Sequence, residues 1–574
     1  MIIYSRKIFP LHCILSALLI IAVTPLSSYA VDSLLDVMEN ELQREMKELG
    51  TQEISPYFMS YGVSDVYSMS ISASFGALTY SNDSESRVLS VKVRVGDYRL
   101  DNTHELRGQY AFSGGGYFPV ALDNNHDALR SALWQETNTQ YRSATERFIK
   151  VKTNVAIKVA EEDSSADFSH EPEIVDFYEP PVDIPALVGD SAKWEEKVKK
   201  YSALFLANEN IYGGSASFGF TVERKNLVTT EGSRLSQNLM YARFSVSGFI
   251  KSDDGMELPI YKTYFAFEPE SLPDDAAILA EISEMIEKLE MLRDTPVVDP
   301  YTGPAILSGR TAGVFFHEIL GHRIEGHRQK SEYEGQTFKK HIDKKILPDH
   351  MNIVFNPTLK TYSGENLMGY YKYDDEGIKA RPVTIFDSGK LTGFLMSRSP
   401  IENFSTSNGH GRAQAGYQPV SRQSNMLIET TKPVSDRELR EKLIALCKEQ
   451  GKTYGLYFKD VQGGFTFTGR SLPNSFNLLP TEVYRIYTDG RPDELVRGVD
   501  LVGTPLVMLS MITDAGETSE IFNGICGAES GSVPVSAISP SLLVTQVEVE
   551  KQSKSQESSP ILPRPDSAGK TLNR

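Results

Sequence analysis

Runs of alternating apolar and polar residues recur in the first half of this chain and restrict it to folds built on β-sheets. Residues 68–79 and 88–95 alternate in this way, with the turn-forming pair Asn82-Asp83 between them. Residues 215–267 have the same strand-like character. A period of two places successive side chains on opposite faces of a sheet. We therefore expect strands with one buried face, and a turn at Asn82-Asp83.

Helical patterns separate these strands. Residues 33–49 form an amphipathic pattern that ends at Gly50, a common residue at the end of a helix. Further helices are expected at residues 126–150, 194–208 and 276–293. The acidic, proline-rich residues 161–188 indicate a surface loop or linker.

The character of the sequence changes after a boundary between Pro296 and Pro304. A helix with several histidines comes first, and many short strands with Gly, Asn and Asp turns follow it, interrupted by one helix near 435–450. We expect an α+β fold, with a mixed α/β N-terminal domain over 31–300 and a β-rich domain over 301–550. Residues 551–574 are rich in Ser, Pro and Lys and are expected to be disordered.

The first thirty residues have the features of a secretory signal peptide. Arg6 and Lys7 precede an apolar run over 13–23 that is too short to span a bilayer, and small residues occupy 28–30. We expect cleavage after Ala30, export to the periplasm or beyond in a bacterium, and no stable membrane span afterwards. An uncleaved membrane anchor is the alternative.

Charge and cysteine content exclude two classes of protein. The formal net charge is −17, whereas nucleic-acid binding needs a basic surface. Once Cys13 leaves with the signal peptide, Cys447 and Cys526 remain, too few for a disulfide scaffold. The two either form one disulfide or have separate roles, and Cys447 occupies a core position of the expected helix near 435–450.

Three of the ten histidines lie within eleven residues, at His317, His322 and His327. Zinc peptidases commonly take two histidines from one helix, and a neighbouring glutamate removes a proton from water. His317 and His322 are five residues apart, and on a regular helix this spacing separates the side chains by roughly 140°. We therefore predict a bulged or broken helix at 319–322, where Gly321 best tolerates the distortion.

A peptidase zinc site also needs a third ligand and leaves its fourth position to water. The candidates are Glu325 and His327 nearby and Cys526 in a distant glycine-flanked segment, and spacing alone does not choose among them. Glu318 is the expected general base. The alternatives are an ordinary amphipathic helix with surface histidines, and a disulfide between Cys526 and Cys447.

Several separate motifs resemble those of the TldD/PmbA family of metallopeptidases, in the family's order and over most of residues 300–550. They are His317-Glu318-x-x-Gly321-His322 continuing to Glu325-Gly326, Asp374-Asp375-Glu376-Gly377, Gly389-Lys390-Leu391-Thr392-Gly393-Phe394, Asn408-Gly409-His410-Gly411-Arg412, Arg497-Gly498 with Leu501-Val502-Gly503, and Cys526-Gly527 with Ser532-Val533-Pro534-Val535.

The resemblance implies a metal held by His317, His322 and Cys526, with Glu318 as the base that activates zinc-bound water. It implies a barrel-like catalytic domain that carries the metal-binding helix. It also implies a homodimer or a heterodimer with a related subunit, and substrates that are unfolded or extended peptides bound by strand addition. Because this chain keeps the histidine motif, it resembles the active type of subunit. One thiolate and two imidazoles favour zinc over other divalent ions.

Two other functions remain possible at this point. The His-Glu-x-x-Gly-His motif also resembles that of dipeptidyl peptidase III, although no Glu-Glu motif follows residue 327 at a suitable distance. A non-catalytic periplasmic zinc-binding assembly or partner protein is the second alternative, but a structural zinc needs no base such as Glu318. In the glycine-rich loop 408–412, His410 or Arg412 could bind substrate as an oxyanion donor, or the loop is only a tight turn.

Overall fold

The computed structural model describes residues 33–106, 116–156, 163–471 and 474–552. The expected signal peptide and nearly all of the expected C-terminal tail therefore lie outside the described residues. Within the described ranges, no helix has the length and apolar character needed to cross a membrane.

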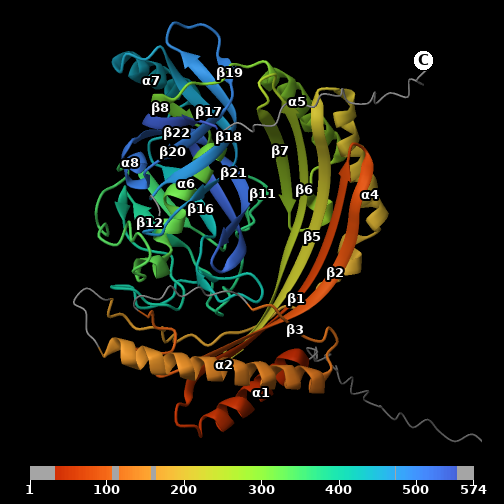
Figure 1. The fold of residues 1–574 in the computed structure, drawn as a ribbon, viewed down its shortest axis with the longest axis vertical. Helices are drawn as coiled ribbons and strands as arrows, with labels where there is room; N and C mark the ends of the chain where they lie inside the picture. Colours follow the sequence, from red (N-terminus) through yellow and green to blue (C-terminus); the bar gives the residue numbers. More distant parts are fainter. Residues whose placement is uncertain (1–32, 107–115, 157–162, 472–473, 553–574) are drawn as a thin grey trace, which may run out of the picture.

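A curved, largely antiparallel sheet forms the first half of the molecule (Figure 1). Its order is β3-β2-β1-β5-β6-β4, with β7 added to β6, and β4 is parallel to β6. The strands are β1 (Pro56–Ser74), β2 (Ala77–Val95), β3 (Phe118–Pro119), β4 (Asp176–Tyr178), β5 (Ile211–Thr229), β6 (Arg234–Lys251) and β7 (Glu257–Ala266).

The predicted turn at Asn82-Asp83 is wrong. The β1–β2 turn lies at Phe75 and Gly76, both with positive φ (48° and 81°), and Asn82 pairs with Ser70 inside the long hairpin. Positive φ at two central residues suits the right-handed twist of a hairpin. The pairing of two 19-residue strands outweighs the weak local turn preference of an Asn-Asp pair.

Helices cover one face of this sheet in two groups. α4 (Ser191–Ala203) packs on β1 and β5, where Trp194 stacks on Phe218, and α5 (Asp275–Arg293) packs on β6 and β7. α1 (Ser33–Leu49) and α2 (His126–Val155) cover the other end, at the bottom of Figure 1. The expected loop over 161–188 also contains β4 and α3 (Ile184–Val188). Two short 3₁₀ turns, η1 (Leu204–Ala207) and η2 (Pro269–Ser271), complete this half.

The second half is built on an eleven-stranded mixed sheet, and the α+β fold class is confirmed. Strand β8 pairs with both β17 and β22, so that β22, β20, β18, β17 and β8 form a closed circuit, the barrel-like part of the domain. The sheet strands are β8 (Tyr301–Leu307), β9 (Met351–Phe355), β12 (Val383–Asp387), β13 (Lys390–Leu391), β16 (Asn425–Thr430), β17 (Tyr454–Thr466), β18 (Phe476–Tyr487), β19 (Glu494–Val496), β20 (Val499–Gly503), β21 (Ile512–Ala528) and β22 (Gly531–Lys551).

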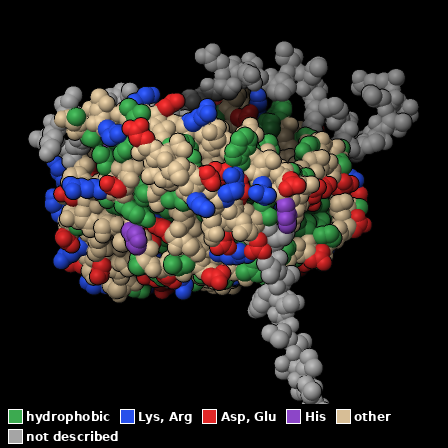
Figure 2. Space-filling view, turned by 90° about the horizontal axis from the view of Figure 1, so that it is seen from below, with side chains coloured by type: hydrophobic (Ala, Val, Ile, Leu, Met, Phe, Trp, Pro, Cys, Tyr) green, Lys and Arg blue, Asp and Glu red, His purple; other side chains and the backbone are tan. Residues whose placement is uncertain are grey.

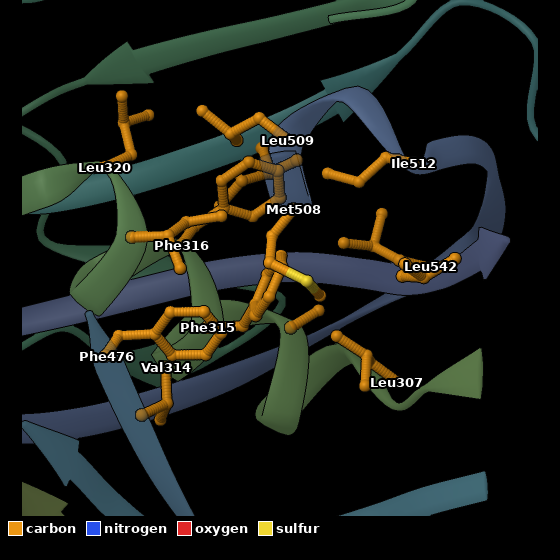
Figure 3. Packing of buried hydrophobic residues seen from close by; sticks show 14 of the residues in the cluster. Leu307, Val314, Phe315, Phe316, Leu320, Phe476, Met508, Leu509, Ile512 and Leu542 are labelled. Atoms are coloured by element: carbon orange, nitrogen blue, oxygen red, sulfur yellow. The ribbon is translucent and has the colours of Figure 1, made fainter. Parts of the chain in front are cut away.

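Helix α6 (Gly309–Ile319) is the central element of this half. Phe315 and Phe316 of α6 pack against Phe476, Met508 and Leu542 in a continuous core (Figure 3). The remaining elements lie around it: η3 (Gly321–Ile324), η4 (Gly326–Gln329), β10 (Thr361–Tyr362) with β11 (Glu365–Asn366), β14 (Gly411–Arg412) with β15 (Val420–Ser421), α7 (Asp436–Glu449) and α8 (Pro505–Ser510). A packed core on α6 fixes the histidine-bearing end of this helix.

Ion pairs join the two halves across their facing surfaces. Arg398 pairs with Glu231 at 2.7 Å, and Lys225 pairs with Asp375 at 2.5 Å. Further pairs are Lys92–Glu376, Lys262–Asp460 and Lys288–Glu482. On the face seen in Figure 2, acidic and basic side chains are interspersed and form no continuous basic surface.

Candidate metal centre

The helix that carries the first histidine ends immediately after it. Ser308 caps α6 by accepting a hydrogen bond from the backbone N–H of Thr311. The helix ends at Ile319, and a 3₁₀ turn over Gly321–Ile324 follows. The predicted break at 319–322 is confirmed, and it takes the form of a helix end and a tighter turn rather than a π-bulge. A Cβ on Gly321 would lie 2.0 Å from Oε1 of Gln423, so a side chain there would require the end of Gln423 to move.

This break brings the two histidines together with the distant cysteine. Ligand atoms of His317, His322 and Cys526 all lie within 4.8 Å of one another. The Sγ atom of Cys526 is 3.4 Å from Nε2 of His322, and the two imidazole rings are 5.0 Å apart at 83°. Cys526 comes from β21, where it pairs with Val533 of β22.

The other candidates for the third ligand have other partners. Glu325 faces the outer nitrogen of His322, with Oε2 3.4 Å from Nδ1. His327 pairs with Glu529. Cys447 is free and buried between α7 and the sheet, and Cys526 is free as well, so no disulfide joins them.

A buried network of charges supports the ligands. Arg328 donates to Glu325 at 2.8 Å, and Arg422 lies 3.4 Å from the same carboxylate. Burial alone would raise the pKa of Glu325, but His322 and Arg328 outweigh it and lower the pKa to about 2. A carboxylate on the outer nitrogen of a ligand histidine fixes the orientation of the ring.

The surroundings of Cys526 favour its thiolate form. Arg422, which is fully buried, donates to the carbonyl of Cys526 at 2.7 Å and to its Sγ at 3.3 Å. Burial opposes ionisation of this thiol, yet His322 and His317 hold its pKa well below the usual range. A thiolate beside two imidazoles is a donor set that suits zinc.

Glu318 lies beside this cluster and is 5% exposed. Its backbone carbonyl accepts a hydrogen bond of 2.6 Å from Arg323. Gly464 of β17 lies so close that a Cβ there would come within 2.8 Å of Cγ of Glu318. Burial is the main cause that raises the pKa of the Glu318 carboxyl above its ordinary value, which brings it nearer to that of an efficient general base at neutral pH.

The cluster opens into a cavity of about 740 Å³. Its lining includes His317, Glu318 and His322, together with residues 464–471 and 525–529. Phe465 and Phe467, at the end of β17, are 45% and 42% exposed. Among the described strands, β21 pairs only with β22.

His410 and Arg412 lie outside this cavity. His410 is fully buried, and burial lowers its pKa to about 3, so that it stays neutral between Asn408 and Ser424. Arg412 donates to the carbonyls of Gln423 and Pro534 and lines a neighbouring cavity.

Sequence reasoning did not identify Arg422, Arg323 or Gly464. Arg422 lies in the polar run 421–425, which is wholly buried before strand β16. In a sequence, a polar run of this kind is typical of a surface turn, so no pattern indicated that these residues are buried.

Comparison with known proteins connects this centre to one group of enzymes. The profile of the PmbA/TldA metallopeptidase C-terminal domain matches residues 300–551. A metalloprotease of Methanocaldococcus jannaschii is 25% identical over 68% of this chain and 82% of its own length. A zinc metalloprotease TldD homolog of Saccharolobus solfataricus is 24% identical over 47% of this chain and 56% of its own length.

Several further relatives are matched over about half of their own length. The crystal structure of TldE from Thermococcus kodakarensis shares the fold, with a TM-score of 0.58 and 13% identity over 89% of this chain and 99% of that one.

Proposed function

Because this chain belongs to the TldD/PmbA family of metalloproteases, we propose that it hydrolyses unfolded or extended peptides at a zinc site formed by His317, His322 and Cys526. The observation that carries the proposal is the convergence of these three ligand atoms beside the buried Glu318. Three protein ligands leave one position open, as in catalytic rather than structural zinc sites.

Zinc, when bound, supplies a Lewis acid for the scissile carbonyl and lowers the pKa of water to near 7. Glu318 takes the proton of the attacking water and delivers it to the leaving amine. An extended peptide adds to the open edge of β21, because backbone N–H and C=O groups there can pair with it. Phe465 and Phe467 offer apolar contacts to its side chains.

Metal analysis and a peptidase assay test this function together. We expect about one zinc per chain in the wild type and loss of zinc in Cys526→Ser, because a hydroxyl is a poor substitute for a thiolate. Glu318→Gln should keep zinc and lose about a hundredfold to ten-thousandfold of kcat, the usual contribution of a general base.

Cys447→Ser is the matched control, since Cys447 is the other buried cysteine and has no ligand nearby; it should keep both zinc and activity. Zinc that persists in Cys526→Ser would overturn the ligand assignment. Full activity in Glu318→Gln would favour the non-catalytic alternative.

The proposal also includes export and assembly. The signal-like first thirty residues support export, with a mature chain from residue 31. The family resemblance supports a homodimer or a heterodimer with a related subunit. The mass of the exported protein tests cleavage and export, and a protein retained whole in the cytoplasm would contradict them. Light scattering of the purified protein tests assembly, and a monomer that is active on its own would contradict it.

A further inference from the structure

A second cavity, of about 410 Å³, adjoins the metal centre. It lies between the face of β5 and β6 that is turned towards the catalytic domain and the segments around residues 371–375 and 412–414. Ile525, the neighbour of Cys526 on β21, lines both this cavity and the metal cavity and is 48% exposed. A peptide that lies along β21 at the metal therefore extends towards this second space.

Arg243 of β6 lines the second cavity. Its neighbours Ala242 and Phe244 are fully buried on the opposite face, so strand alternation turns Arg243 towards the catalytic domain. The residue opposite it on β5 is Gly219, which adds no side chain beside the guanidinium. Within the ranges that the structure describes, Arg243 has neither a carboxylate partner nor a side-chain hydrogen bond.

Arg412 adds a second positive charge to the same cavity. Its guanidinium donates to two backbone carbonyls, at 2.5 and 2.8 Å, and lies 4.7 Å from the ring centre of Tyr371. These neutral partners hold the side chain in place and leave its charge without a counterion among the described side chains.

The acidic residues of this cavity are already engaged. Asp375 pairs with Lys225 at 2.5 Å and accepts a hydrogen bond of 2.7 Å from the N–H of Ala413. Asp374 accepts from three backbone N–H groups. Glu223 lies 3.6 Å from Lys225. Burial is the main cause that raises the pKa of both Asp374 and Glu223. The cavity is thus lined by three basic and three acidic side chains, but none of these carboxylates forms an ion pair with Arg243 or Arg412.

We propose that this cavity is a specificity subsite for a carboxylate of the peptide substrate, bound by Arg243 and favoured by the charge of Arg412. The inference rests on the proposed peptidase function and adds a substrate class to it. A guanidinium without an internal partner binds a carboxylate in a charge-assisted, often bidentate, hydrogen-bonded pair. The carboxylate is either the free C-terminus of the peptide or an Asp or Glu side chain several residues from the cleaved bond.

Matched peptides distinguish these two sources. Starting from one peptide that the zinc-loaded wild type cleaves, one arm compares a free C-terminus with a C-terminal amide. The other arm compares Glu with Gln at each position in turn. We expect one of these replacements to lower kcat/KM of the wild type by about tenfold, the loss of one charge-assisted hydrogen bond.

Arg243→Gln should abolish this discrimination by lowering kcat/KM only for the carboxylate peptide, while the neutral peptide is cleaved as before. Arg243→Lys should retain part of the discrimination because it keeps the charge. Arg437→Gln is the charge-matched control; its side chain is 86% exposed on α7, and the discrimination should be unchanged.

Equal cleavage of all peptides by the wild type, or discrimination that persists in Arg243→Gln, would overturn the subsite and leave the peptidase function intact. If the zinc-loaded wild type cleaves none of the peptides, the proposed function itself fails, and the subsite fails with it.

Discussion

Single residues around the ligands determine how firmly the metal centre is preorganised. Glu325 is fully buried and interacts with His322, Arg328 and Arg422. It binds no metal in the proposed site, yet it links a ligand histidine to two arginines. Mutation of groups in this position typically lowers metal affinity by about ten- to a hundredfold.

Replacing Glu325 with Gln should make the stability of the metal-free protein depend less on pH. Glu325 has its pKa lowered to about 2 by His322 and Arg328, against burial, while its unfolded value is about 4.3. A lowered folded pKa contributes stability that is present above the unfolded pKa and is lost as the pH falls towards the folded one.

The difference in unfolding free energy between wild type and Glu325→Gln should therefore shrink from pH 6 to pH 3, as measured by urea unfolding in the presence of a chelator. A difference that stays constant over this range would show that the ion pairs of Glu325 do not stabilise the fold. Zinc affinity of the same variant should fall about ten- to a hundredfold.

At the scale of the elements, the end of α6 is the feature on which the site depends. A continuous helix would place His317 and His322 on different sides. Because the helix ends at Ile319 and a turn over Gly321–Ile324 follows, the two histidines instead lie close together. Gln423 packs against Gly321 in this turn.

Gly321→Ala should disrupt this turn. The added Cβ would come within 2.0 Å of Gln423, so side chain or backbone must shift, at a cost of about 1–3 kcal/mol for overpacking. Zinc occupancy and the midpoint of thermal unfolding should both fall. Gly393→Ala, whose Cβ would make an ordinary contact of 3.6 Å with Phe404, is the control. Normal zinc binding by Gly321→Ala would show that the turn tolerates a side chain.

The elements also show what sequence patterns can predict. The helices at 33–49, 126–150 and 276–293 were predicted within a few residues, because periodicity and terminal residues are local properties. The turn at Asn82-Asp83 was not, because long-range pairing of β1 and β2 carried the strand through it. Contacts between distant parts of the chain leave no local pattern. The spacing argument therefore found His317 and His322 but could not select Cys526, and the arginines around the site were missed.

At the scale of the whole molecule, the second cavity exists only while the two halves stay together. Arg398 of the catalytic half is 2% exposed and reaches Glu231 in the β5–β6 turn with hydrogen bonds of 2.7 and 2.8 Å. It also lies 3.9 Å from the ring centre of Phe168. Arg398 therefore links the two halves through an ion pair and through contact with an aromatic ring.

Arg398→Met should lower the free energy of unfolding by about 3 kcal/mol, the cost of leaving one partner of a buried ion pair unpaired. The double variant with Glu231→Gln should recover part of this loss, because no charge is then left buried. Chemical denaturation measures both. Arg437→Gln, which removes the exposed pair with Glu441, should change the stability by no more than about 0.5 kcal/mol. Equal effects of the Arg398 and Arg437 variants would exclude a stabilising role for the inter-half pair.

The proposed ligands come from distant parts of the chain. His317 lies on α6 and His322 on η3, and Cys526 of β21 follows His322 by 204 residues. During synthesis, the segment with both histidines leaves the ribosome long before the cysteine does. A chain that has not yet added β21 lacks the thiolate and cannot assemble the centre. In the proposed site all three ligands are needed to hold the metal, so we expect hydrolytic activity only after β21 has joined the sheet.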